Sequence, residues 1–173
     1  MAKLLLIDPE KCTGCRTCEV VCSLSHEQRC NPAESRISIV KYHDAGIAIP
    51  MTCQNCQEPV CAAVCPTNAL RPDSEMGRVV IDYELCIGCK LCVAACPIGG
   101  MGLDARGQRV IKCDLCDGDP VCVKFCETGA LKYLEVASLG LAKRREAAQK
   151  LFQLLERVGG TVSYEQALRP KGG

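Results

Sequence analysis

The sequence predicts an α+β fold in which two pseudo-symmetric units, made of short β-hairpins and short helices, wrap around bound metal clusters. One observation is composition: the 173 residues include 17 Cys but only two Phe, four Tyr and no Trp. Large side chains that normally fill a core are therefore scarce. A second is that the cysteines recur in groups at metal-ligand spacing. A third is that the stretches around these groups repeat along the chain.

Sixteen of the cysteines form four motifs. Motif one is Cys12, Cys15, Cys18 and Cys22, and motif three is Cys86, Cys89, Cys92 and Cys96, both spaced C-x2-C-x2-C-x3-C. Motif two is Cys53, Cys56, Cys61 and Cys65, spaced C-x2-C-x4-C-x3-C. Motif four is Cys113, Cys116, Cys122 and Cys126, spaced C-x2-C-x5-C-x3-C.

This spacing favours iron–sulfur clusters over zinc. Three thiolates on one tight loop can hold three corners of a cubane, while the fourth cysteine reaches the other cluster in bacterial two-cluster ferredoxins. Structural zinc instead uses two C-x2-C pairs separated by a longer loop. Motifs one and three do not fit that pattern, because each places three cysteines within seven residues. We therefore predict four [4Fe–4S] clusters in bacterial-ferredoxin-like units, with a structural zinc module as the alternative.

An internal duplication organises the chain. The stretch "LLIDPEKCTGC" before motif one matches "VVIDYELCIGC" before motif three, and "CPTNALR" after motif two matches "CETGALK" after motif four. Each Ile-Asp pair predicts the end of a short apolar strand that leads into a ligand loop. Asp44 to Gly46 predict the turn of a further hairpin. Taken alone, the duplication suggests that motif one pairs with two and three with four.

Several classes of function are not indicated. The net charge of +1 gives no sign of a nucleic-acid partner, and no nucleophile–base set or Gly-rich phosphate loop is visible. No segment has the length and apolarity of a membrane span. The start of the chain does not read as an export signal, so we expect a cytoplasmic protein with reduced thiols. Cys30 is expected to be a free thiol, and His26 and His43 to be loop or surface residues.

The four motifs in this order, with extra residues in motifs two and four, resemble the sixteen-cysteine electron-transfer subunits of multi-subunit oxidoreductases. These are the small iron–sulfur partners of the dimethyl sulfoxide reductase family and of related carbon monoxide dehydrogenases, hydrogenases and tungsten enzymes. The resemblance covers residues 3–134. The stretches "CPIGGMG" and "KCDLCDGDPVCVKFCETGAL" are most similar to subunits that accompany tungsten aldehyde oxidoreductases and benzoyl-coenzyme A reductases. Glu127 departs from the usual Cys-Pro.

The resemblance implies that motif one pairs with four and motif two with three. The ligand sets are then Cys12, Cys15, Cys18 and Cys126; Cys113, Cys116, Cys122 and Cys22; Cys53, Cys56, Cys61 and Cys96; and Cys86, Cys89, Cys92 and Cys65.

The implied function is a non-catalytic relay. It would carry electrons from a tungsten–pterin aldehyde oxidoreductase subunit to a ferredoxin or a flavin subunit that reduces NAD. The same relay for a molybdenum oxidoreductase, carbon monoxide dehydrogenase or hydrogenase stays open, as does a free polyferredoxin.

The segment 135–159 predicts an amphipathic helix beyond the four-cluster domain of residues 1–134, followed by a tail at 160–173. Good helix formers dominate the segment, and Gly159-Gly160 end it. Its apolar residues fall near one face, and we expect that face to bind a partner or a second copy of the chain. The alternative is that it packs on the four-cluster domain. The apolar residues are Leu141, Ala148, Leu151, Phe152, Leu155 and Val158.

Overall fold

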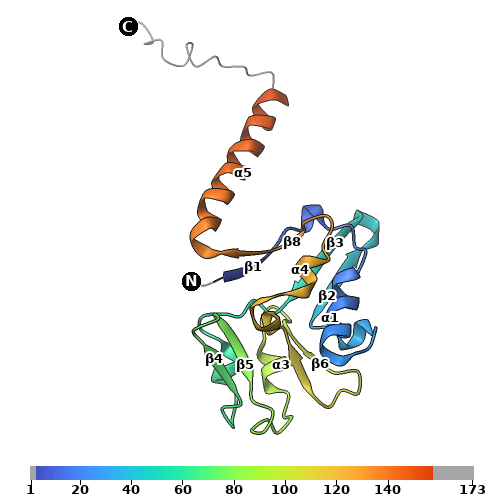
Figure 1. Cartoon of the computed structure of the whole chain (residues 1–173), viewed down its shortest axis with the longest axis vertical. Coiled ribbons are helices and arrows are strands. Elements are labelled where there is room, and N and C mark those ends of the chain that lie inside the picture. The colour runs from blue at the N-terminus through green and yellow to red at the C-terminus, as the bar shows by residue number, and fades with distance from the viewer. Residues whose placement is uncertain (1–2, 158–173) are drawn as a thin grey trace, which may run out of the picture. The chain divides into compact units, whose positions relative to one another are not determined.

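The computed structural model describes residues 3–157, which divide after Glu135 into two units (Figure 1). The first is a small mixed domain of short strands and short helices. The second is helix α5 (Val136–Arg157). Val158, the expected stop at Gly159-Gly160 and the tail at 160–173 lie outside the described residues.

Four two-stranded antiparallel sheets form the strand content of the described part of the first unit. They pair β1 (Lys3–Ile7) with β8 (Leu131–Glu135), β2 (Ile37–Tyr42) with β3 (Ile47–Thr52), β4 (Leu70–Asp73) with β5 (Arg78–Ile81), and β6 (Met101–Leu103) with β7 (Val110–Lys112). Strands this short gain little stability alone. They need a shared centre to pack against.

Each cysteine motif carries its third cysteine on a helix. These helices are α1 (Thr17–Glu27), α2 (Val60–Ala63), α3 (Leu91–Ala95) and α4 (Val121–Lys124). Short 3-10 turns fill the connections: η1 (Pro9–Lys11), η2 (Pro32–Glu34), η3 (His43–Ala45) and η4 (Leu115–Gly118). Helices of four or five residues are too short to be stable in isolation, so tertiary contacts hold them in place.

Local predictions from the sequence are confirmed at three places. Strand β1 ends at Ile7 and β5 at Ile81, directly before the aspartates of the repeated Ile-Asp pair. The turn at residues 44–46 is real: η3 joins β2 to β3, and Gly46 takes the left-handed backbone (φ 64°) that a tight return needs.

The buried side chains form two groups. One contains Cys18, Cys22, Ile37, Cys122 and Leu131. The other contains Leu70, Val79, Cys92, Met101 and Val110. Motifs one and four thus share one group, and motifs two and three line the other. The antiparallel pairing of β1 with β8 brings the two ends of the first unit together.

Glu19 connects motif one to the neighbouring hairpin of β2 and β3 by hydrogen bonds. Its side chain is 1% exposed. One carboxylate oxygen accepts the Ile39 peptide N–H at 2.6 Å and the other accepts Arg16 Nε at 2.5 Å. Because β2 pairs with β3 along one edge, the carboxylate satisfies a donor on the opposite edge, where a buried N–H left alone would be costly.

Candidate metal centres

Motifs one and three curl the backbone in the same way. Gly14 and Gly88 have φ of 70° and 69°, and Arg16 and Lys90 have φ of 65° and 64°. Left-handed backbone costs a non-glycine residue roughly 1–2 kcal/mol. The same strain at matching positions of two loops indicates loops shaped to surround a bound group. Helices α1 and α3 begin directly after these loops.

Motif four reaches its curvature differently, as its extra residues require. Leu115, Cys116 and Asp117 in η4 have φ of 61°, 47° and 53°, three left-handed non-glycine residues in succession. The Asp114 side chain accepts the Cys116 N–H at 3.0 Å and so caps this turn. In motif two, Asn55 takes φ of 47° between the first two cysteines.

Three cavities of the first unit each combine three cysteines of one motif with the last cysteine of another. The first is lined by Cys12, Cys15, Cys18 and Cys126. The second is lined by Cys113, Cys116, Cys122 and Cys22. The third is lined by Cys86, Cys89, Cys92 and Cys65.

The remaining cysteines of motifs two and three form a fourth group. Burial raises the pKa of Cys53 and of Cys61, and the nearby Cys96 acts on both in the same direction. Cys56 acts likewise on Cys53. Cys96 itself lies beside motif two. Gly100, which follows Cys96 closely in the sequence, packs so tightly against the Cys53 backbone that it has no room for a Cβ.

The structure therefore brings the last cysteines of motifs one and four each to the other motif, and those of motifs two and three likewise. These are the sets that the family resemblance implies and not those that the duplication alone suggests. That the sets bind clusters stays a prediction.

The chemistry of the sites suits thiolate ligation. All sixteen motif cysteines are free thiols. Burial, with the Glu19 charge next, raises the pKa of Cys18 to about 12. Burial, followed by the neighbouring Cys113 and Cys116, also raises the pKa of Cys122 well above its ordinary value. Without a cation these thiols stay protonated, so a metal cluster that binds them displaces protons and adds its binding energy to folding.

Peptide N–H groups already point at several of these sulfurs. Such donors favour an electron-rich sulfur and tune cluster potential. The donating pairs, with N to Sγ distances, are Arg36 to Cys22 (3.3 Å), Asn55 to Cys53 (3.4 Å) and Gly100 to Cys96 (3.3 Å).

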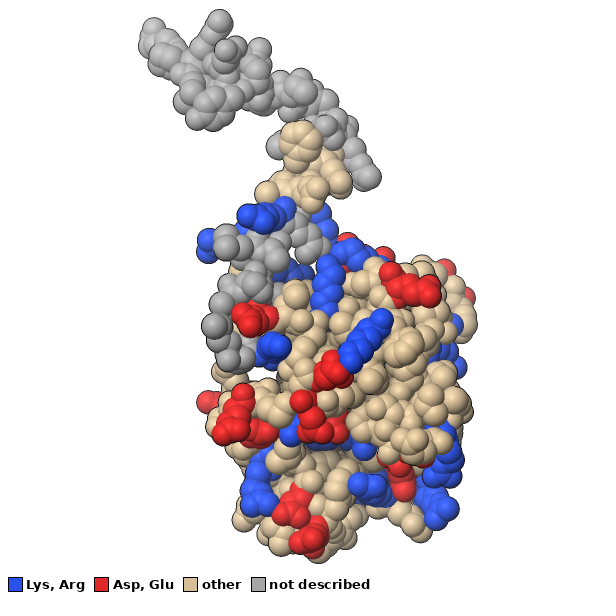
Figure 2. All heavy atoms as spheres, viewed as in Figure 1, with Lys and Arg blue, Asp and Glu red and all other residues tan. Residues whose placement is uncertain are grey.

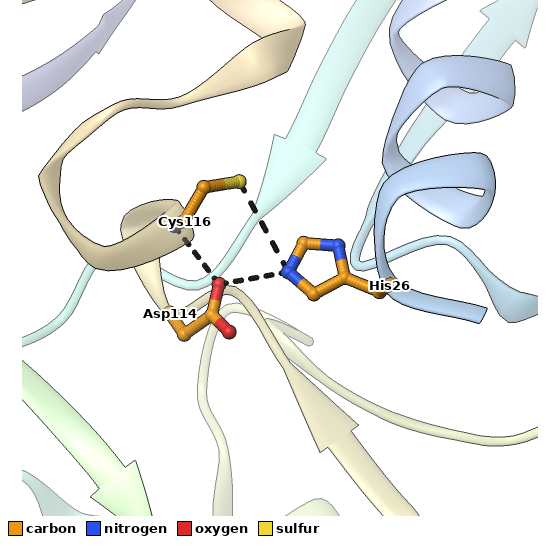
Figure 3. A group of neighbouring side chains, drawn as sticks. All are labelled: His26, Asp114 and Cys116. Carbon is orange, nitrogen blue, oxygen red and sulfur yellow. Dashed lines mark hydrogen bonds and ion pairs between the residues drawn. The ribbon is translucent and has the colours of Figure 1, made fainter. Parts of the chain in front are cut away.

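His26 is a site residue that sequence reasoning missed, and the expectation of a loop or surface position was wrong for it. It lies on α1 with a side chain only 13% exposed, and it points toward Asp114 and Cys116 (Figure 3). Its Nε2 is 3.1 Å from Asp114 Oδ1 and 4.0 Å from Cys116 Sγ, and its Nδ1 is 2.9 Å from the Cys22 carbonyl oxygen. The bond to Asp114, first among the causes, raises the pKa of His26.

The sequence did carry one signal for the position of His26. It follows Cys22 by four residues and therefore lies on the same face of the helix. His43 is exposed in η3, as expected. Cys30 is an exposed free thiol that lies outside the four cysteine groups.

The surface and the helices add two observations. Basic and acidic side chains are intermixed over the face shown in Figure 2. Among residues 3–157, no helix combines the length and the apolarity needed to cross a membrane.

Comparison with known proteins places this geometry in a family. Residues 45–136 match the 4Fe-4S dicluster domain, and residues 3–24 match a 4Fe-4S binding domain. The chain belongs to the 4Fe-4S dicluster family. It is a polyferredoxin-type iron–sulfur protein, a non-catalytic electron-transfer subunit.

Its relatives include a putative electron transport protein, YsaA, of Escherichia coli K12, which is 39% identical over 87% of this chain and 99% of that protein. The polyferredoxin-like subunit of an aliphatic sulfonate oxidoreductase from Pyrococcus furiosus is 50% identical over 54% of this chain. That match spans about half of the relative, 53% of its length. A solved structure titled as the active-site complex BamBC of benzoyl coenzyme A reductase with benzoyl-CoA contains a chain that is 27% identical over 96% of this chain and 97% of its own, with a TM-score of 0.46.

Proposed function

We propose that the chain holds four [4Fe–4S] clusters and passes single electrons between a catalytic subunit and an acceptor. The observation that carries the proposal is the grouping of sixteen cysteines into four sets of four, each drawn from two motifs. When bound, such clusters supply one-electron exchange at a potential set by their surroundings. The chain contributes the thiolates, the curled loops that hold them and the N–H groups aimed at sulfur.

We propose that the four sets form one row, with the set completed by Cys126 and the set completed by Cys65 at its two ends. Each exchange of a last cysteine ties two sets together: motif one with four, and motif two with three. The two pairs meet at Thr52 and Cys53, because Thr52 lines the same cavity as Cys113 of motif four while Cys53, the next residue, belongs to motif two. Both outer sets contain an exposed cysteine, Cys15 and Cys89, and one inner set contains exposed Cys56. We propose that electrons enter and leave at the two outer sets, which form the ends of the row.

Paired cysteine substitutions test the ligand sets. In the proposed sets Cys22 and Cys116 hold one cluster, whereas Cys22 and Cys12 hold different ones. The wild-type chain should bind about 16 iron, four per cubane. Cys22→Ala with Cys116→Ala should retain about 12, and Cys22→Ala with Cys12→Ala about 8.

The measurement is iron and acid-labile sulfide per chain after anaerobic reconstitution. The reverse order for the two double variants would show that motif one closes its own cluster. A colourless, zinc-loaded wild type would refute iron–sulfur clusters altogether.

For the partner we propose a tungsten–pterin aldehyde oxidoreductase catalytic subunit, with a ferredoxin or a flavin subunit that reduces NAD as acceptor. The support is the similarity of the segments around motifs three and four and a relative that is named as a subunit of an oxidoreductase. Reduced thiols in sixteen ligand positions fit a cytoplasmic location.

The test is anaerobic purification of the tagged chain from its native host. We expect tungsten in the complex and bleaching of the visible absorbance by an aldehyde. Molybdenum or nickel instead would assign the same relay to a molybdenum enzyme, a carbon monoxide dehydrogenase or a hydrogenase, and a chain that purifies alone would be a free polyferredoxin.

We also propose that α5 binds a partner chain or a second copy of this chain. Leu151, Phe152 and Leu154 on this helix are exposed, and large apolar side chains grouped in water favour association. Deletion of residues 137–173 should leave iron content and the visible spectrum unchanged but should reduce the size of the complex on size-exclusion chromatography. Loss of iron in the truncated chain would mean instead that the helix belongs to the cluster domain.

A further inference from the structure

A buried lysine lies where the two pairs of cysteine sets meet. Lys112 ends β7 directly before Cys113 and is 4% exposed. Its ammonium donates to Asn55 Oδ1 at 2.9 Å, to the Cys113 carbonyl oxygen at 2.6 Å and to the carbonyl oxygen of Val79. Three donors and three acceptors satisfy the ammonium completely.

These contacts fix a positive charge without cancelling it. All three acceptors are neutral oxygens. One comes from the next residue, Cys113, and the other two come from the motif two loop and from β5, which are far from Lys112 in the sequence. A buried charge of this kind is rarely kept unless a group of opposite charge lies close by.

The nearby groups that become negative are thiolates of two sets. Asn55, which accepts from the ammonium, also donates its peptide N–H to Cys53 Sγ at 3.4 Å, and the carbonyl oxygen at 2.6 Å from the ammonium is that of Cys113. Burial raises the pKa of Cys53, Cys61 and Cys113, and in line with these contacts the Lys112 charge acts against burial and lowers it. Cys53 and Cys61 belong to the set completed by Cys96, and Cys113 belongs to the set completed by Cys22. Both are inner sets of the row.

We infer that Lys112 is the residue that sets the potentials of the two inner clusters, and that it holds them above the two outer ones. The inference rests on the proposed ligand sets. Each reduction adds one negative charge to a cluster, and a fixed cation a few ångströms away favours the reduced form. In the outer sets, Lys112 is not among the main causes of the raised pKa of Cys18 or of Cys92. Electrons that arrive at either end of the row would therefore collect on the two inner clusters before they leave.

The test is an anaerobic redox titration, followed by electron paramagnetic resonance and visible absorbance, on full-length protein of known iron content. Lys112→Met removes the charge and keeps the length of the side chain. We expect about half of the titrating signal to shift to a lower potential. The reduction equilibrium of these clusters should change by a factor of ten or more, which is ~59 mV for one electron. Lys112→Arg should remain close to wild type. Lys124→Met removes an exposed lysine within motif four that is paired with Asp119, and it should leave the potentials unchanged.

A second variant keeps the test decisive if Lys112→Met loses iron. Asn55→Asp places a carboxylate on the ammonium at the position of an existing hydrogen bond. It cancels the charge without removing the lysine, and the same half of the signal should shift downward. Potentials that stay unchanged in an iron-replete Lys112→Met or Asn55→Asp protein would overturn the inference. Wild-type iron content reports separately on the ligand sets, so failure of the proposed function is distinguishable from failure of the role of Lys112.

Discussion

Removal of the Glu19 carboxylate should release iron from the protein much faster, because this side chain holds motif one against β2. The carboxylate accepts the Ile39 N–H at 2.6 Å and is 1% exposed. A hydrogen bond to a buried charged group contributes about 1.5–3 kcal/mol, and a donor left unpaired costs a similar amount. Arg16 is 52% exposed on its side chain, so its ion pair adds at most about 1 kcal/mol.

We expect Glu19→Ala to cost about 3 kcal/mol, since it orphans the Ile39 N–H. Glu19→Gln keeps an acceptor and loses only the charge, so it should cost about 1 kcal/mol. If the whole loss falls on unfolding, iron release accelerates up to about 100-fold for the alanine variant and about fivefold for glutamine.

The assay follows visible absorbance in guanidinium under anaerobic conditions, because loss of metal makes unfolding irreversible and the rate is then the meaningful quantity. Glu84→Gln, which changes an exposed carboxylate near motif three, is the matched control. If Glu19→Ala releases iron no faster than this control, the carboxylate does not anchor motif one and the reasoning is refuted.

Three further predictions concern single contacts. Gly100→Ala would place a Cβ 2.7 Å from a backbone carbon of motif two, so it should lose about a quarter of the iron, whereas Gly102→Ala, whose Cβ would meet its nearest atom at 3.5 Å, should keep it. Arg78→Ala removes a side chain that is 13% exposed and bonds to β4 and η4. We expect the folded state to lose about 2 kcal/mol of stability, seen as faster iron release. Arg78→Lys should recover only part of this loss. His26→Ala breaks the contact between α1 and η4 and should speed release of about a quarter of the iron, while His43→Ala at an exposed turn should not.

Sequence reasoning succeeded where structure depends on neighbours along the chain. The strand ends at Ile7 and Ile81 and the turn closed by Gly46 follow from short-range rules for apolar runs and turn residues. The cysteine spacing is informative in the same way, because a loop that carries three sulfurs within seven residues can surround only a small bound group. Family membership then rests on that spacing, and the comparisons bear it out.

Contacts between distant segments do not follow from the sequence pattern alone. The duplication suggests pairing within each half of the sequence, whereas the family resemblance implies that motif one pairs with four and motif two with three. In the structure β1 pairs with β8, and the buried groups join motif one to four and motif two to three. An internal repeat shows that a segment was duplicated, but it does not show which of the duplicated segments pack together. His26 and Asp114 are 88 residues apart, so a pattern in the sequence around either one carries no sign of their contact.

By itself the sequence determined the chemistry of this protein: thiol ligands in four motifs, with short strands and tight loops to carry them. Local spacing decides that chemistry, because the geometry of a ligand loop is set within a few residues. The grouping of last cysteines with motifs, which the pattern left open and the family resemblance implied, is seen only in the tertiary structure. The tertiary structure also shows that Lys112 is buried and His26 half-buried beside the sulfurs. The Lys112 ammonium and Asn55 are 57 residues apart. The environment of a charged side chain is made by the segments that fold over it, and so it is a property of packing and not of local sequence.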